Sequence, residues 1–197
     1  NLEMALNNPS DVLTLLEDYT INGDLYIEQG TLQINDDASA TSLNLLLEGD
    51  LNVLPNGSLL TGEGDAYHQL ELLGDLVNEG TIEFTNRTLP AQSSYYTSDA
   101  SDGVVEVTFS NPSANQEVVC NGLTKFYRMI IKKGIDDTYM VDVTADAPNN
   151  FHLLGRCDYS GEADGTSTPP HALALDEGTF RIGPDVEIPE LKVGGGN

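Results

Sequence analysis

Basic residues are scarce in this 197-residue chain. Eight lysines and arginines stand against 32 aspartates and glutamates, which gives a formal net charge of −24. A surface this negative repels nucleic acids and anionic membranes, because both carry charge of the same sign. Nucleic-acid binding is therefore excluded, and the partners that the charge favours are calcium, basic proteins or simple counterions.

Cysteine and long apolar runs are also rare. The two cysteines, Cys120 and Cys157, are not in a C-x-x-C arrangement, which excludes the usual zinc and redox motifs. They could form one disulfide, which would suit an exported protein, or remain two buried thiols. No apolar run approaches the ~20 residues that span a membrane, and no signal peptide is visible. The start at Asn1 and the repeat-like residues 193–197 suggest a piece of a longer protein.

Catalytic motifs are missing as well. There is no H-E-x-x-H spacing, no G-x-S-x-G turn and no phosphate-binding glycine loop. The three histidines are scattered along the chain, at His68, His152 and His171. Asp136 and Asp137 follow Lys132 and Lys133 closely, which leaves a lyase-like base as an alternative. The sequence predicts that the chain is not an enzyme.

A repeated tripeptide is the main positive signal. Gly-Asp-Leu occurs three times, at residues 23–25, 49–51 and 74–76. The spacings are 26 and 25 residues, and each copy is followed by a second glycine, at Gly30, Gly57 and Gly80. A glycine at such a place indicates a corner with positive φ. Repetition at this near-constant interval indicates units that stack on one another.

Apolar and polar residues alternate within each unit. In the first unit the apolar positions are Tyr19, Ile21, Leu25, Ile27, Leu32 and Ile34. Runs with a period of two between glycine turns predict short strands with one face inward. A hairpin sandwich would not need one motif at a constant interval. The sequence therefore predicts an all-β, right-handed parallel β-helix, a solenoid with coils of about 25 residues and loop insertions.

Some segments depart from the repeat. Residues 85–103 and 158–170 are polar or rich in glycine and proline, and we expect them to be insertions. The first 16 residues could form a short capping helix that begins at Ser10 or Asp11. The predicted domains are a cap or linker over residues 1–18 and the β-solenoid over residues 19–197.

One stretch resembles a known module. It consists of residues 107–109, Asn115-Gln116, Cys120-Asn121-Gly122, residues 124–127 and residues 130–133. This series is similar to a module of repeat-containing secreted surface proteins of Bacteroidetes-type bacteria, in which an Asn-Gln turn, a strand, a Gly turn and Thr-x-Phe-Tyr follow one another. The resemblance covers roughly residues 19–183. It implies a parallel β-helical stack that is exported to the cell surface as an adhesin or structural part.

The repeat carries carboxylates at one position. Such repeats often have Asn after the corner glycine, but here the residues are Asp24, Asp50 and Asp75. If adjacent coils stack in register, these carboxylates lie about 5 Å apart. Like charges at that distance raise one another's pKa or recruit a cation. Two interpretations stay open. The aspartates could be exposed turn residues whose charges are screened by water, or they could form an edge that binds Ca²⁺. Calcium is the one cofactor that the sequence suggests.

Four tyrosines in predicted loops could bind carbohydrate. They are Tyr67, Tyr95, Tyr96 and Tyr159. Exposed loop tyrosines can stack on sugar rings, although they also occur in ordinary loops.

These patterns together predict a non-enzymatic extracellular structural or adhesive surface protein, a rigid β-helical rod or filament component. Its partners would be other surface proteins, further copies of itself, or glycans. Its location would be secreted or at the cell surface. The alternative is a carbohydrate-binding or polysaccharide-cleaving β-helix protein.

Overall fold

The chain is built from strands and turns. The computed structural model describes residues 1–36, 41–62, 64, 66–85, 103–155, 172–184 and 186. Within these ranges the only helical element is a short 3-10 helix, η1 (Pro148–Asn150). The all-β part of the prediction is therefore confirmed. Of the predicted insertions, residues 86–102 and 158–170 lie outside the described residues.

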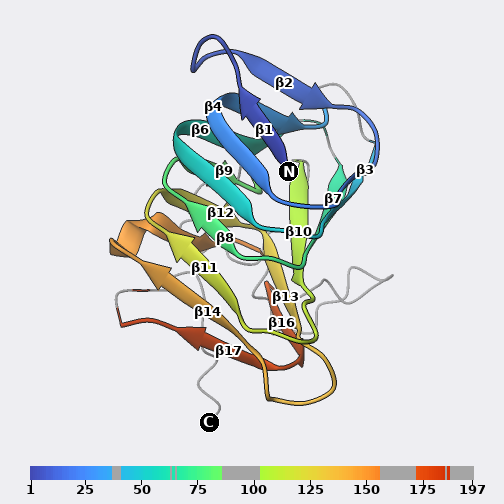
Figure 1. The fold of residues 1–197 in the computed structure, drawn as a ribbon, viewed down its shortest axis with the longest axis vertical. Coiled ribbons are helices and arrows are strands. Elements are labelled where there is room, and N and C mark those ends of the chain that lie inside the picture. Colours follow the sequence, from blue (N-terminus) through green and yellow to red (C-terminus); the bar gives the residue numbers. More distant parts are fainter. Residues whose placement is uncertain are drawn as a thin grey trace, which may run out of the picture.

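An eleven-stranded parallel sheet, the large sheet, curls along one side of the molecule (Figure 1). Its strands are β1 (Leu2–Ala5), β2 (Val12–Leu15), β4 (Leu25–Ile34), β6 (Leu51–Thr61), β8 (Leu76–Asn78), β9 (Thr81–Glu83), β11 (Gln116–Cys120), β12 (Leu123–Phe126), β14 (Met140–Ala145), β15 (Phe151–Leu153) and β17 (Thr179–Ile182). The order is β15-β12-β9-β6-β8-β11-β14-β17, with β4 beside β6, and β1 and β2 beside β4. Neighbours in this sheet are therefore far apart in the sequence.

A six-stranded parallel sheet, the small sheet, lies opposite. Its strands are β3 (Tyr19–Ile21), β5 (Asn44–Leu47), β7 (Tyr67–Leu72), β10 (Val104–Phe109), β13 (Arg128–Lys132) and β16 (Leu173–Glu177). The order is β16-β13-β10-β7-β5-β3. The chain alternates between the two sheets, so each sheet turns one face of alternating side chains toward the other.

The predicted fold class, a right-handed parallel β-helix or solenoid with coils of about 25 residues, is wrong. The structure has two parallel sheets of unequal size, one of them curled into a half-barrel, and not a regular stack of coils. Residues that are hydrogen-bonded between successive rows of the large sheet are separated by different lengths of chain. Asp75 and Glu117 are 42 residues apart, whereas Asn115 and Met140 are 25 residues apart. The chain therefore does not repeat one unit of constant length.

The sequence predicted a corner at the second glycine of each unit, but the first two units have no corner at these glycines, Gly30 and Gly57. β4 and β6 run unbroken through Gly30 and Gly57, which pair with each other. Of these two glycines only Gly30 has a positive φ, 93°. The pairing of β4 with β6 slips between Ile27 and Gln29, as at a β-bulge, and bulges bend strands. Long bent strands thus replace the short strands and corners that the pattern predicted.

The predicted N-terminal capping helix is also wrong. Residues 1–18 contain β1 and β2, and both strands pair with β4. The polar residues that indicated a helix cap close the turn between these strands. The carboxylate of Asp11 accepts a hydrogen bond from the backbone N–H of Asn8 at 3.0 Å. Aspartate that bonds a nearby backbone group favours turns as well as helix caps, so the local signal was ambiguous.

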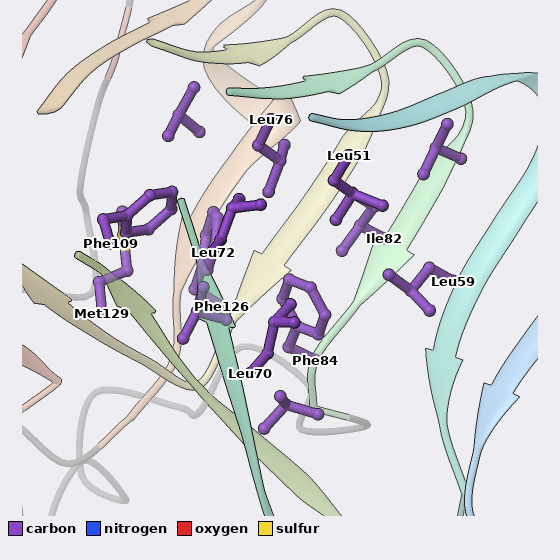
Figure 2. Close-up of a cluster of buried hydrophobic side chains, with 14 of the residues drawn as sticks. Leu51, Leu59, Leu70, Leu72, Leu76, Ile82, Phe84, Phe109, Phe126 and Met129 are labelled. Carbon is purple, nitrogen blue, oxygen red and sulfur yellow. The ribbon is translucent and has the colours of Figure 1, made fainter. Parts of the chain in front are cut away.

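The core lies between the inward faces of the two sheets (Figure 2). Toward the N-terminal end it is mainly leucine and isoleucine, including Leu51, Leu59, Leu70, Leu72 and Ile82. Further along the chain phenylalanines fill it. The ring centre of Phe126 lies 5.6 Å from that of Phe84, 6.4 Å from Phe109 and 5.7 Å from Phe151. Phe126 on β12 therefore joins side chains from both sheets.

Candidate functional site

Asp24, Asp50 and Asp75 occupy equivalent positions on neighbouring strands, because the leucines that follow them pair in one register. Oδ1 of Asp24 accepts a hydrogen bond from the backbone N–H of Asp50 at 3.0 Å, and Oδ1 of Asp50 accepts one from Asp75 at 2.8 Å. The series extends to both sides, since Asn1 accepts from the N–H of Asp24 and Asp75 accepts from that of Glu117. We call Asn1, Asp24, Asp50 and Asp75 the aspartate ladder.

The glycine before each aspartate gives the ladder its space. A Cβ atom on Gly49 would lie 2.3 Å from Oδ1 of Asp24, and one on Gly74 would lie 2.4 Å from Oδ1 of Asp50. Real Cβ atoms do not approach other atoms this closely. The Gly-Asp-Leu tripeptide therefore supplies three things: room for the preceding carboxylate, the next hydrogen-bond acceptor and a leucine for the core.

The ladder is the site where calcium was expected. Within the described ranges no group of three or more His, Cys, Asp or Glu side chains is placed to hold a metal ion. One oxygen of each of Asp24, Asp50 and Asp75 accepts a backbone hydrogen bond from the next strand. The contacts shown by the ladder thus hold neighbouring strands in register. Calcium binding by these carboxylates stays a prediction.

Substitution of Asp50 tests what the ladder contributes. Asp50→Ala removes the acceptor for the N–H of Asp75, and we expect it to lower the free energy of unfolding by about 1–2 kcal/mol. Asp50→Asn keeps an acceptor oxygen and removes one of several neighbouring negative charges. It should therefore leave the free energy of unfolding unchanged, or raise it at low ionic strength. Urea denaturation at low and high salt measures both. An alanine variant as stable as the asparagine variant would contradict the ladder's role.

Cys120 on β11 is fully buried and has no disulfide partner among the described residues. Burial raises its pKa to about 12, against a smaller opposite effect of the hydroxyl of Thr124. A buried protonated thiol is unreactive at neutral pH. Cys157, the predicted disulfide partner, lies outside the described residues, so the disulfide stays a prediction.

The two histidines that the structure describes do not form a site. His68 is buried on the small sheet, where its Nδ1 accepts a hydrogen bond from the N–H of Leu43 at 3.0 Å. Burial lowers the pKa of His68. His152 lies on β15 with Nε2 2.9 Å from the carbonyl oxygen of Asn149. His171 lies outside the described residues. The two histidines that the structure describes have packing roles.

The lyase-like arrangement also does not form. Asp136 and Asp137 lie in an exposed turn after β13. Asp136 accepts a hydrogen bond from the N–H of Thr138 at 2.9 Å, and hydrogen bonds from Thr138 hold the pKa of Asp136 below its usual value. Lys133 points into the protein instead, where its Nζ donates to Oε1 of Gln116 at 2.6 Å. The acidic pair and the buried lysine are thus in different surroundings.

Lys133 is an unusual buried cation, because its side chain has no exposed surface. Its partner Gln116 is also held in place, since Nε2 donates to the carbonyl oxygens of Leu72, at 3.0 Å, and Gly74. Burial lowers the pKa of Lys133 to about 8, with a smaller opposite effect of Asp75. A buried lysine opposes folding while it is charged.

Lys133→Met should stabilise the protein by about 1–3 kcal/mol at pH 7, because it removes a buried charge. Gln116 keeps its bonds to Leu72 and Asn111. In the wild type the unfolded chain binds more protons than the folded chain between pH 8 and 10.5, so stability should rise with pH there. By pH 9.5 the difference in the free energy of unfolding between Lys133→Met and the wild type should be smaller by about 1–2 kcal/mol. A constant gap in urea denaturation from pH 7 to 9.5 would contradict the shifted pKa.

The outer face of the small sheet carries a polar cluster. Tyr67 donates a hydrogen bond to Oε2 of Glu106 at 2.7 Å, and Arg128 forms an ion pair with the same oxygen. The ring of Tyr67 meets that of Tyr127 edge-on, with centres 5.9 Å apart. Burial and the bond to Glu106 raise the pKa of Tyr67. Tyr67 is thus fixed at the start of β7 and does not lie in a loop. The other predicted sugar-stacking tyrosines, Tyr95, Tyr96 and Tyr159, lie outside the described residues.

Pairing in the small sheet places polar side chains in one row across the strands. Asn44 pairs with Gln69, Gln69 with Glu106, and Glu106 with Arg128. Asp18 precedes the row and accepts a hydrogen bond from the N–H of Asn44 at 2.8 Å. We call these five residues the polar row. The four residues on strands alternate with core residues and therefore face outward, and Asp18 lies directly before β3.

A groove of about 380 Å³ lies over this face. It contains most of the polar row, and its other lining residues are Tyr19, Thr20, Leu45, Leu46, Leu70, Glu71 and Thr108. Tyr19 borders the groove at the β3 edge, but it pairs in register with Leu45, which pairs with the buried Leu70, so its side chain lies on the inner face of the sheet. We call this the outer groove. It is formed by β3, β5, β7 and β10, which are consecutive strands of the small sheet; Figure 1 labels β3, β7 and β10.

The carboxylates of the outer groove are already hydrogen-bonded within the protein. Asp18 accepts from Asn44, and Glu71 accepts from the hydroxyl of Ser110 at 2.7 Å. Glu106 accepts from Tyr67 and is paired with Arg128, as described above. These carboxylates make the groove negative, but much of their bonding capacity is used.

The neutral groups of the groove are different. The side-chain amide of Gln69 and the hydroxyls of Thr20 and Thr108 form no hydrogen bond with other residues in the described part of the chain. Gln69 is exposed on the face of the sheet. The groove thus offers an external ligand neutral donors and acceptors on a negative background.

A second hollow, of about 330 Å³, lies between the sheets at the N-terminal end. Its lining is almost wholly apolar, with Glu3 as the one charged residue. Leu13 borders it and is 47% exposed. We call this the apolar end cavity. It could shield an apolar surface from water, but it holds no group that suggests chemistry.

The residues of the outer groove were not identified from the sequence. Asn44, Gln69 and Glu106 share no motif, and they become neighbours only through strand register. Alignment of the apolar alternation around Leu45, Leu70 and Val107 would have revealed them, since each polar residue directly precedes one of these apolar residues.

No family model, curated protein or solved structure matches this chain. The resemblance to surface proteins of Bacteroidetes-type bacteria therefore stays a prediction. Among the described residues no helix is long and apolar enough to cross a membrane.

Proposed function

We propose that this chain is a non-enzymatic structural or adhesive protein of the cell surface. The observation that carries the proposal is the outer groove, which presents a row of polar side chains on strands held in register. Side chains on regular strands are placed more precisely than side chains on loops, which suits recognition of a partner. The row combines amide, carboxylate and guanidinium groups, so it favours binding through many hydrogen bonds.

Carbohydrate binding is the second candidate, and the free amide and hydroxyl groups of the groove favour it. Cleavage is less well supported. A glycosidase needs two carboxyl groups that flank the sugar bond and reach it freely. Here Glu71 is bonded to Ser110, and Glu106 is paired with Arg128. The groove is therefore better suited to hold a chain of sugars than to cut it.

Self-association and a secreted or cell-surface location belong to the same proposal. The location is supported by the resemblance of the segment around residues 107–133 to exported modules. Self-association is supported by the apolar end cavity, where Leu13 is exposed to solvent. Sedimentation velocity over a range of protein concentrations tests it, and a single monomeric species at every concentration would remove this part of the proposal.

The experiment on function uses the purified chain and a panel of soluble polysaccharides. Reducing ends are assayed over a long incubation, and adhesion to intact cells of the source organism is measured with fluorescently labelled protein. The proposal expects adhesion above that of an unrelated acidic protein, with no new reducing ends. New reducing ends above a heat-denatured control would contradict the non-enzymatic assignment.

A further inference from the structure

We infer that the ligand of the outer groove is an uncharged polysaccharide chain that lies across β3, β5, β7 and β10. This inference rests on the adhesive function proposed above and adds the chemical class of the partner. Three observations lead to it: the charge of the groove, the state of its carboxylates, and the arrangement of its neutral groups.

The charge of the groove excludes acidic glycans. Asp18, Glu71 and Glu106 all line it, and its neighbouring cation, Arg128, is already paired with Glu106. The whole chain has a net charge of −24. A polymer of uronates or sulfated sugars would bring further negative charge to a surface with no free cation in the described groove. A neutral chain avoids this repulsion.

The carboxylates of the groove keep part of their bonding capacity. Glu106 is already paired with Arg128, and Asp18 and Glu71 each accept a hydrogen bond from the protein. A carboxylate has about four acceptor sites, so the hydroxyl groups of a neutral sugar can donate to the remaining lone pairs without displacing these bonds. Asp18 and Glu71 also keep their charge, so a basic ligand is the competing occupant that the poly-lysine probe tests.

The neutral groups are arranged to follow a chain. Gln69 on β7 and Thr108 on β10 lie on adjacent strands, and Thr20 on β3 lies two strands away from β7. Neighbouring strands are about 4.8 Å apart, which is similar to the length of one pyranose ring in an extended polysaccharide.

Affinity gel electrophoresis of the intact chain tests the inference. The neutral probes are xyloglucan, galactomannan and hydroxyethylcellulose, the anionic probes are alginate and polygalacturonate, and poly-lysine is the basic probe, measured in solution by calorimetry. We expect retardation by at least one neutral polymer and by neither anionic polymer. Gln69→Ala combined with Thr108→Ala should weaken that retardation at least about tenfold.

Thr144→Ala is the matched control, because Thr144 is an exposed threonine on β14 of the large sheet. It should leave binding unchanged. Thermal melting shows whether the groove variant is folded, and substitutions of exposed side chains are expected to change stability little. If the double variant is unfolded, Gln69→Glu provides the second test, since it removes the side-chain NH2 donor of Gln69 while keeping nearly the same size and should therefore weaken binding.

The outcomes separate the inference from the proposed function. Binding of poly-lysine alone, binding of an anionic polymer, or neutral binding unaffected by the groove variants would each overturn the inference. Binding of no probe would also overturn it, while adhesion to cells could still support the adhesive function. New reducing ends in the same mixtures would instead overturn the non-enzymatic assignment.

Discussion

Gly57→Ala should lower the free energy of unfolding by about 3 kcal/mol. A Cβ atom on Gly57 would lie 2.1 Å from the carbonyl oxygen of Ile27 on the neighbouring strand. That oxygen belongs to the backbone of β4, which is paired with β1, β2 and β6, so it has little freedom to move away. The added methyl group therefore forces two paired strands apart.

The reason for this glycine is close approach and not a left-handed turn, because Gly57 is not among the glycines with positive φ. Gly183→Ala is the control, since a Cβ atom there would meet its nearest atom, the carbonyl oxygen of Val143, at 3.4 Å. Urea denaturation measures both variants. Equal stability of the two would show that β4 and β6 do not approach as closely as described.

Phe126→Ala should lower the free energy of unfolding by about 3–5 kcal/mol. The ring of Phe126 is fully buried, and it is packed against the rings of Phe84, Phe109 and Phe151. Its removal leaves a hole between the two sheets that three large rings cannot fill without leaving their own positions. The loss therefore combines lost burial with the cost of a cavity.

Phe180→Ala provides the comparison, because Phe180 is only partly buried, on β17 at the end of the large sheet. We expect Phe180→Ala to lower the free energy of unfolding by at most about half as much as Phe126→Ala does. The loss from Phe126→Leu should lie between these two values. Chemical denaturation with tyrosine fluorescence or circular dichroism measures all three. A larger loss from Phe180→Ala than from Phe126→Ala would place the centre of the core elsewhere.

The equivalence of Asp24, Asp50 and Asp75 could be predicted from the sequence. Their near-constant spacing and the leucine that follows each of them indicate parallel strands in one register, as the structure shows. What the ladder does could not be predicted, because it depends on the distance between a carboxylate and the backbone of the next strand. The sequence left open water-screened turn aspartates or an edge that binds calcium; the structure shows that these carboxylates accept hydrogen bonds from backbone N–H groups, and calcium binding stays a prediction.

The regular solenoid was predicted because glycine was interpreted in one way only. A glycine after a strand can mark a corner, but it can also mark a place where two backbones approach closely. Gly57 is of the second kind, and β6 continues through it. The uneven intervals between later strands, such as the 42 residues between Asp75 and Glu117, follow no repeated motif and were also not predictable.

The outer groove depends on register between strands that are far apart in the chain. Each of its polar residues, taken alone, is an ordinary outward side chain of a half-buried strand. Only the pairing of Asn44 with Gln69 and of Gln69 with Glu106 gathers them into one surface. The candidate site is therefore a property of sheet pairing and not of any local motif.

The register set by the aspartate ladder is the claim on which the sheets, and through them the groove, depend. It can be measured by NMR as a scalar coupling across the hydrogen bond between the backbone ¹⁵N of Asp75 and the carboxylate ¹³C of Asp50, whose donor and acceptor atoms lie 2.8 Å apart. The structure predicts that this coupling is observed in the folded chain and is lost in Asp50→Ala. Its absence, in a sample where backbone couplings between β6 and β8 are seen, would contradict the account.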